Sequence, residues 1–168
     1  INKGSQNFFA EQLLKTIGLE KLGLGSVVNG VAAAKEVFID IGLNPDNIIM
    51  VDGSGLSYLN MVTPRQIVDL LKYIYSNKKV YADFYNSLPI AGVDGTLGKR
   101  MKNTTAENVV RGKTGYISYV RSLSGYAVTG DNEPIAFSMI ANNFSVPVKL
   151  AENIQDLVCL RLTKFRRK

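Results

Sequence analysis

Residues 109–143 read VVRGKTGYISYVRSLSGYAVTGDNEPIAFSMIANN. Segments 120–129 and 134–143 are rich in Val, Ile, Tyr and Phe, the β-branched and aromatic residues that favour strands. Residues 130–133, Gly-Asp-Asn-Glu, have the composition of a hairpin loop. An earlier strand is expected where Val109 and Val110 lead into residues 113–115. The stretch therefore predicts a three-stranded antiparallel meander.

The sequence on either side of this stretch has helical spacing. Apolar residues recur every three to four positions before residue 87, and again over 147–163. Gly18 and Gly42 are expected to end the first two helices, and Thr63 to cap the third. The order of helices, meander and final helix predicts an α+β fold in which the last helix covers one face of the sheet. The earlier helices are expected at 5–17, 27–41, 64–75 and 78–86. The core-facing stripe of the last helix is expected to be Leu150, Ile154, Leu157, Val158 and Arg161.

Length and composition indicate one globular domain spanning 1–168. The chain has 168 residues, is 46% hydrophobic and contains no histidine, which excludes Ser-His-Asp catalysis and histidine metal sites. The lone cysteine, Cys159, stands among apolar residues and is expected to be a small core residue or a half-buried apolar one. No apolar run has the length of a membrane span. The net charge of +6 comes without a nucleic-acid recognition motif, so no nucleic-acid partner is expected.

Two short motifs suggest acyl-transfer chemistry without histidine. Ser5-Gln6-Asn7 matches S-x-N, and Lys113-Thr114-Gly115 matches K-T-G. A lysine ammonium beside a hydroxyl can hold a carboxylate, and a glycine leaves room for a substrate main chain along the strand. The N–H of Tyr116 can then face a developing oxyanion. Two simpler interpretations stay open: Ser5 as a helix N-cap and Lys113 as a solvated lysine.

Longer segments carry a resemblance to a known family. They are NKGSQNFFAE (2–11), VDGSGLS (51–57), LPIAGVDGTL (88–97), KTG (113–115) and SLSGY (122–126). Together they resemble the class C low-molecular-mass penicillin-binding proteins, the serine D-alanyl-D-alanine carboxypeptidases/endopeptidases of the bacterial envelope. The resemblance implies the serine β-lactamase/transpeptidase-like fold, and it places the chain in the C-terminal half of a penicillin-binding domain.

Site roles follow from this resemblance. Ser5, Asn7 and Lys113 match catalytic positions, while Thr114, Gly115 and Tyr116 match substrate-binding positions. The family commonly has a small or hydroxylated residue where this chain has Tyr116, so a hydroxyl contact to the substrate carboxylate is expected to be lost or displaced. Segments 51–57 and 92–97 are expected to be structural turns that shape the surroundings of the site.

The third motif of the family, S-x-x-K, carries the nucleophile and precedes S-x-N. The chain's match, Ser76-Asn77-Lys78-Lys79, follows S-x-N and is attributed to chance. The true motif is therefore expected upstream of residue 1, and the isolated chain is expected to be inactive. The alternative is a non-catalytic module that binds peptidoglycan peptides or has a structural role. A β-lactamase is a third and weaker interpretation.

The resemblance also implies partners and location. It implies no metal or organic cofactor, peptidoglycan stem peptides and β-lactams as ligands, and a periplasmic or other extracytoplasmic location. In the family, strands from the N-terminal part of the domain pair beside the last strand of the meander. Strand 134–143 is therefore expected to have an open edge, covered by the N-terminal part of the same domain or by a second copy of the chain.

Overall fold

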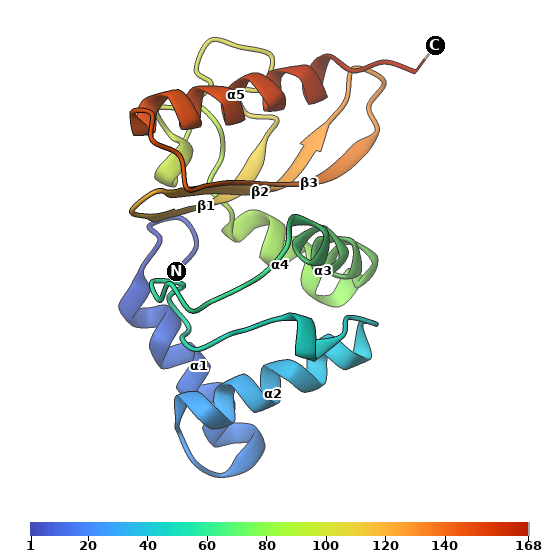
Figure 1. Ribbon diagram of the computed structural model, residues 1–168. Coiled ribbons are helices and arrows are strands. Elements are labelled where there is room, and N and C mark those ends of the chain that lie inside the picture. Colours follow the sequence, from blue (N-terminus) through green and yellow to red (C-terminus); the bar gives the residue numbers. More distant parts are fainter. Residues whose placement is uncertain (168) are drawn as a thin grey trace. The chain divides into compact units, whose positions relative to one another are not determined.

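The computed structural model describes residues 1–167, which form two compact units. The helical unit comprises Ile1 and Gln6–Leu70, and the sheet unit comprises Asn2–Ser5 and Leu71–Lys168. Ser5 therefore belongs to the sheet unit although it lies close to the first helix in sequence. Figure 1 shows the elements of each unit in sequence colours.

The helical unit is built on two crossing helices, α1 (Asn7–Leu22) and α2 (Val27–Asp40). The prediction that Gly18 ends the first helix is wrong, because the helix continues to Gly23, whose φ of 76° provides the left-handed C-cap. Gly18 lies instead at the crossing, where an added Cβ would be 2.6 Å from the backbone nitrogen of Gly30. The two glycines thus let the helix backbones come into contact. A short 3₁₀ turn, η1 (Pro45–Asn47), follows α2.

Helices α3 (Pro64–Ser76) and α4 (Lys78–Ser87) lie close to their expected positions. The predicted cap at Thr63 is confirmed. Its Oγ1 accepts a hydrogen bond from the Gln66 N–H at 3.3 Å, while Gln66 Oε1 accepts from the Thr63 N–H at 2.7 Å. This reciprocal pair is a capping box, which fixes where α3 begins.

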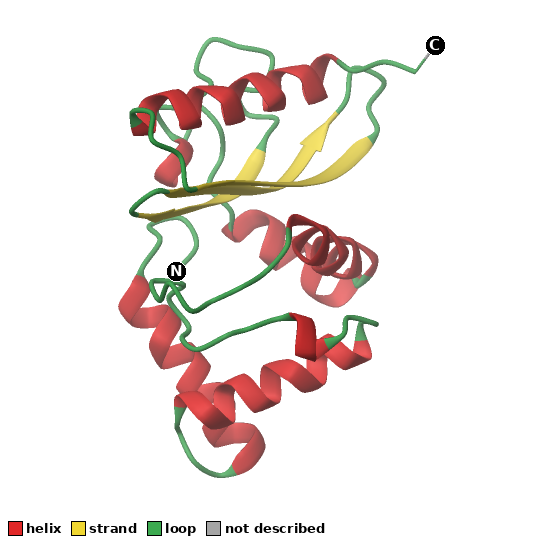
Figure 2. Cartoon of the chain, viewed as in Figure 1, coloured by secondary structure: helices red, strands yellow, loops and turns green. Residues whose placement is uncertain are grey.

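The meander is confirmed (Figure 2). Strands β1 (Arg111–Ile117), β2 (Val120–Val128) and β3 (Pro134–Asn142) pair antiparallel in the order β1-β2-β3. Lys113 lies opposite Ser124, which in turn lies opposite Ser138. On one face of the sheet, the Tyr126 hydroxyl donates to the carbonyl oxygen of Leu71 in α3. The second 3₁₀ turn, η2 (Gly95–Leu97), precedes β1.

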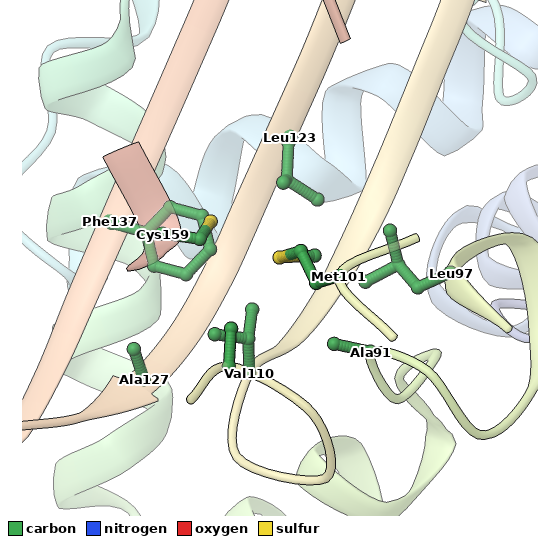
Figure 3. Packing of buried hydrophobic residues seen from close by; sticks show 9 residues of the cluster. Ala91, Leu97, Met101, Val110, Leu123, Ala127, Phe137 and Cys159 are labelled. Carbon is green, nitrogen blue, oxygen red and sulfur yellow. The ribbon is translucent and has the colours of Figure 1, made fainter. Parts of the chain in front are cut away.

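Helix α5 (Val148–Lys164) covers the other face of the sheet, as expected (Figure 1). The core beneath it contains Cys159, which is completely buried, so the prediction for this residue is confirmed. Figure 3 shows how the apolar side chains of this core pack against one another. The cluster consists of Ala91, Leu97, Met101, Ala106, Val110, Leu123, Ala127, Phe137 and Cys159.

The predicted core-facing stripe of α5 is wrong. Leu150, Ile154, Leu157, Val158 and Arg161 are exposed, and Leu157 retains 62% of its accessible surface. The buried face instead carries Ala151, Gln155, Cys159 and Thr163. Small side chains allow the helix to approach the sheet closely, and Gln155 is accommodated because its amide donates to the carbonyl oxygen of Arg121.

No single helix within residues 1–167 is long and apolar enough to cross a membrane. By length and composition alone, α1 and α2 together reach the threshold, as a pair bent by 76°.

Candidate active site

Ser5 and Lys113 meet in the sheet unit although they are 108 positions apart in the sequence. The ammonium of Lys113 donates to Ser5 Oγ over 2.7 Å, and both side chains are half-buried. Lys113 Nζ also donates to the carbonyl oxygen of Thr114. The interpretation of Lys113 as a solvated lysine is therefore wrong.

Burial affects the ionisation of Lys113. Removing the ammonium from water lowers the pKa of this lysine below its ordinary value. A lysine in this state releases a proton more readily than a surface lysine, and as an ammonium it presents a poorly solvated positive charge to an anionic ligand.

Ser5 lies just before α1 in an unusual main-chain conformation. Ser5 has a φ of 49°, a left-handed conformation that is uncommon for a residue other than glycine. Gln6, not Ser5, occupies the N-cap position of α1, and α1 has no side-chain cap. The N-cap interpretation of Ser5 is therefore wrong. Asn7, the first residue of α1, belongs to the helical unit, and its role at the site stays a prediction.

Strand β1 presents its outer edge beside this pair. The Gly112 N–H donates to the Pro89 carbonyl oxygen at 3.0 Å, so Gly112 faces away from β2. Because strand groups alternate in direction, the N–H and C=O groups of Thr114 and Tyr116 also lie on this outer edge. A peptide or an oxyanion approaching the edge would meet these groups.

Gly115 has a packing role that the sequence did not indicate. It lies opposite Ser122 on β2, and a Cβ at this position would overlap Ser122 Oγ. The glycine of the K-T-G motif therefore leaves room for a neighbouring hydroxyl, in addition to any room it leaves for a ligand.

Tyr116 turns its ring away from Lys113, because the side chains of residues 113 and 116 lie on opposite faces of the strand. The guanidinium of Arg121 lies over the ring, 3.2 Å from its centre, and also pairs with Glu152 at 3.6 Å. On this face a groove of about 180 Å³ is lined by Thr96, Arg100, Thr114, Gly115, Tyr116, Arg121, Ser122 and Glu152. Sequence reasoning missed both arginines, and it placed Thr96 in a turn near the site without indicating that its hydroxyl contacts Thr114.

Ser76 and Lys79 do not form the helical pair that an S-x-x-K nucleophile requires. Ser76 is the last residue of α3, and its hydroxyl donates to the Tyr73 carbonyl oxygen at 2.8 Å. Lys79 belongs to the next helix, α4. Within residues 1–167, no group of three or more Asp, Glu, Cys or His side chains could hold a metal ion.

Sequence comparisons with known proteins point to D-Ala-D-Ala carboxypeptidases. The model of the D-Ala-D-Ala carboxypeptidase 3 (S13) family matches residues 1–164. The D-alanyl-D-alanine carboxypeptidase of Actinomadura sp. (strain R39) is 40% identical over 97% of this chain and 30% of its own length. The D-alanyl-D-alanine carboxypeptidase DacB of Haemophilus influenzae is 32% identical over 85% of this chain and 30% of its own length. The chain thus spans about a third of the length of the curated relatives it matches.

The same fold occurs in a solved structure. Penicillin binding protein 4 (dacB) from H. influenzae superposes with a TM-score of 0.88 at 28% identity, over 98% of this chain and 38% of that one. That protein has also been solved in complex with a novel β-lactam. The match confirms the α+β, transpeptidase-like arrangement expected from the sequence.

Proposed function

Because the chain belongs to the D-Ala-D-Ala carboxypeptidase 3 (S13) family, we propose that it is part of a serine D-alanyl-D-alanine carboxypeptidase/endopeptidase. The substrate would be a peptidoglycan stem peptide, cleaved through an acyl-enzyme, and penicillin would acylate the same serine. Residues 1–168 would form the C-terminal half of the penicillin-binding domain. The observation that carries the proposal is the hydrogen bond between Lys113 Nζ and Ser5 Oγ, which joins the two motifs.

Each motif residue has a chemical task in this proposal. The Ser5 hydroxyl, held by Lys113, would relay a proton between the nucleophile and the leaving amine. Lys113 and Thr114 would hold the terminal carboxylate of the substrate. The Tyr116 N–H on the outer edge of β1 would stabilise the oxyanion. Asn7 would orient the substrate amide.

The nucleophile would come from another part of the protein. An S-x-x-K motif preceding S-x-N does not occur in residues 1–168, and Ser76 and Lys79 lie on different helices. We therefore assign the nucleophilic serine and its lysine to sequence outside these residues. An envelope location, periplasmic or otherwise extracytoplasmic, is part of the same proposal.

A second function is favoured by the same observation. Without a nucleophile, the chain would act as a module that binds peptidoglycan peptides, or as a structural part, without turnover. This alternative and the enzyme share Lys113 and Thr114 as carboxylate ligands and differ in covalent chemistry.

Mass spectrometry after incubation with benzylpenicillin tests the proposal. The protein as cells produce it should gain the mass of one penicillin, and peptide mapping should place the adduct on a serine outside residues 1–168. The 168-residue chain alone should gain no mass. Lys113→Met in the cellular protein should slow acylation about 100-fold. The exposed Lys79 provides the matched control, and Lys79→Met should leave the rate unchanged.

Two results would contradict the proposal in different ways. If the cellular protein gains no mass, it is not a penicillin-reactive serine enzyme, and the binding module becomes the better description. If an adduct maps to Ser5 or Ser76, the nucleophile lies within the chain, and the relay role given to Ser5 is wrong.

A further inference from the structure

Thr96 touches both motif-bearing segments of the sheet unit. Its main-chain N–H donates to the carbonyl oxygen of Lys3 at 3.2 Å, two residues before Ser5. Its side-chain hydroxyl pairs with the Thr114 hydroxyl at 2.8 Å. One residue therefore connects the segment that carries Ser5 with the strand that carries Lys113 and Thr114.

The turn around Thr96 holds the Ser5 segment at close range. Gly95 has a φ of 56°, and a Cβ there would be 2.6 Å from the Lys3 carbonyl oxygen. Only a glycine satisfies both the conformation and the contact. The Lys3 ammonium pairs with Asp94 Oδ2 at 2.5 Å, and Asp94 Oδ1 accepts from the Ile90 N–H at 2.9 Å. Burial raises the pKa of Asp94, but these hydrogen bonds outweigh it and lower the pKa overall.

The turn is itself anchored in the core of the sheet unit. Leu97 is completely buried, and its carbonyl oxygen accepts from the Gly92 N–H at 3.1 Å. The Ala91 N–H donates to the Val110 carbonyl oxygen at 2.9 Å, just before β1. Thr96 therefore makes its contacts from a turn that is fixed to the core. Such a turn can maintain the left-handed φ of Ser5.

We infer that the turn at residues 94–96 holds Ser5 against Lys113, and that Thr96 within it is a positioning residue that orients the Thr114 hydroxyl toward a ligand carboxylate. The inference rests on the proposed function for the identity of that ligand. Without ligand, Thr114 donates its hydroxyl proton to Thr96 Oγ1. When a carboxylate arrives, the Thr114 proton rotates toward it and the Thr96 hydroxyl donates to Thr114 Oγ1. No covalent bond changes, and Thr114 becomes a stronger donor because it accepts a hydrogen bond at the same time.

Three variants of the 168-residue chain separate this role from a structural one. Thr96→Val removes the hydroxyl and keeps the shape, while Thr96→Ser keeps the hydroxyl. Thr105→Val is the matched control, because Thr105 makes a similar pair with the Thr163 hydroxyl at 2.9 Å, within the same unit. The probes are N-acetylated Lys-D-Ala-D-Ala and its C-terminal amide, with binding followed by NMR.

The expected result is selective for the carboxylate. Thr96→Val should weaken binding of the free-acid peptide about 10-fold and leave the amide unchanged, because only a charged acceptor gains from the stronger donor. Thr96→Ser and Thr105→Val should bind both peptides as the wild type does. Equal binding of the free acid by Thr96→Val and the wild type would overturn the orienting role.

A second measurement does not depend on ligand binding. Cross-peaks between the Ser5 Hβ and Lys113 Hε protons should be present in the wild type and lost in Lys3→Met, which removes the ion pair with Asp94. If the wild type binds neither peptide, the proposed ligand is wrong, and these cross-peaks decide the positioning role alone. Their persistence in Lys3→Met would overturn it. Lys3→Met also tests whether Ser5 is held against Lys113 if Thr96→Val does not fold. Lys3→Met should itself fold, since Lys3 and Asp94 form a partly exposed pair whose loss costs little stability.

Discussion

Lys113 combines a positive charge with a half-buried position. Its ammonium has hydrogen-bond partners in Ser5 and Thr114, while burial disfavours its charged form and lowers its pKa. An ordinary surface lysine would be better solvated. The protein thus tolerates an electrostatic cost at this residue, which is typical of a position kept for binding or catalysis.

The cost at Lys113 should appear as a pH dependence of stability. At neutral pH the lysine is charged in both folded and unfolded states, so the penalty is fully present. As the pH approaches 10.5, the ordinary pKa of a lysine, Lys113 loses its proton at lower pH in the folded state than in the unfolded state. The loss of the proton relieves the cost of burying the ammonium. The free energy of unfolding of the wild type should therefore rise relative to that of Lys113→Met over this range, measured by urea denaturation.

Lys79→Met provides the reference for this titration, because it removes a positive charge from an exposed position. A difference between the wild type and Lys113→Met that stays constant up to pH 10.5 would mean that burial does not perturb Lys113.

At the scale of elements, the packing of α5 and α1 differs from what their sequence patterns predict. The apolar stripe of α5 is exposed, and the buried face contains Ala151 and Cys159. The spacing of apolar residues identifies an apolar stripe on a helix but does not show whether that stripe packs against the sheet. In α1, Gly18 looks like a stop signal but lies inside the helix, because α2 passes too close for a larger residue.

Substitution at the helix crossing should therefore be costly. Gly18→Ala gains about 1 kcal/mol in helix propensity but places a Cβ 2.6 Å from the Gly30 nitrogen. We expect a net loss of about 1–3 kcal/mol in the free energy of unfolding, from overpacking against a backbone atom. Gly25→Ala is the control, because its Cβ would find no atom closer than 3.5 Å. Equal stabilities of the two variants would contradict the close crossing.

At the scale of the whole molecule, the sheet ends at β3. This strand pairs with β2 as the last strand in the described sheet, and its sequence, PIAFSMIAN, contains no charged residue. The Thr129 N–H donates to the Glu133 carbonyl oxygen, so by alternation Ala136, Ser138 and Ile140 direct their main-chain groups outward. Natural edge strands carry charges, prolines or bulges that block further pairing, whereas β3 has no charge, pairs with β2 without a bulge and has a proline only at its first residue. We propose that this edge pairs with another strand, from the N-terminal part of the domain or from a second copy.

Sedimentation and hydrogen exchange test the open edge. The 168-residue chain should associate at micromolar concentration, with the amides of Ala136, Ser138 and Ile140 protected only in the associated form. Ala136→Pro should reduce association, because it removes an outward N–H and leaves the ladder to β2 intact. A stable, dilute monomer in which these outward amides exchange slowly would contradict the proposal.

The sequence alone determined the order and type of the elements, the two motifs and the family. These follow from local chemistry: β-branched and aromatic residues over 120–129 and 134–143, a capping threonine before Pro64, and short strings of residues in a fixed order. Three features needed the folded structure: which face of α5 is buried, why residue 18 is a glycine, and how Thr96 links the Lys3–Ser5 segment to Thr114. Those features depend on atoms far apart in the chain, and one sequence records the identity of each residue but not its distance from the others.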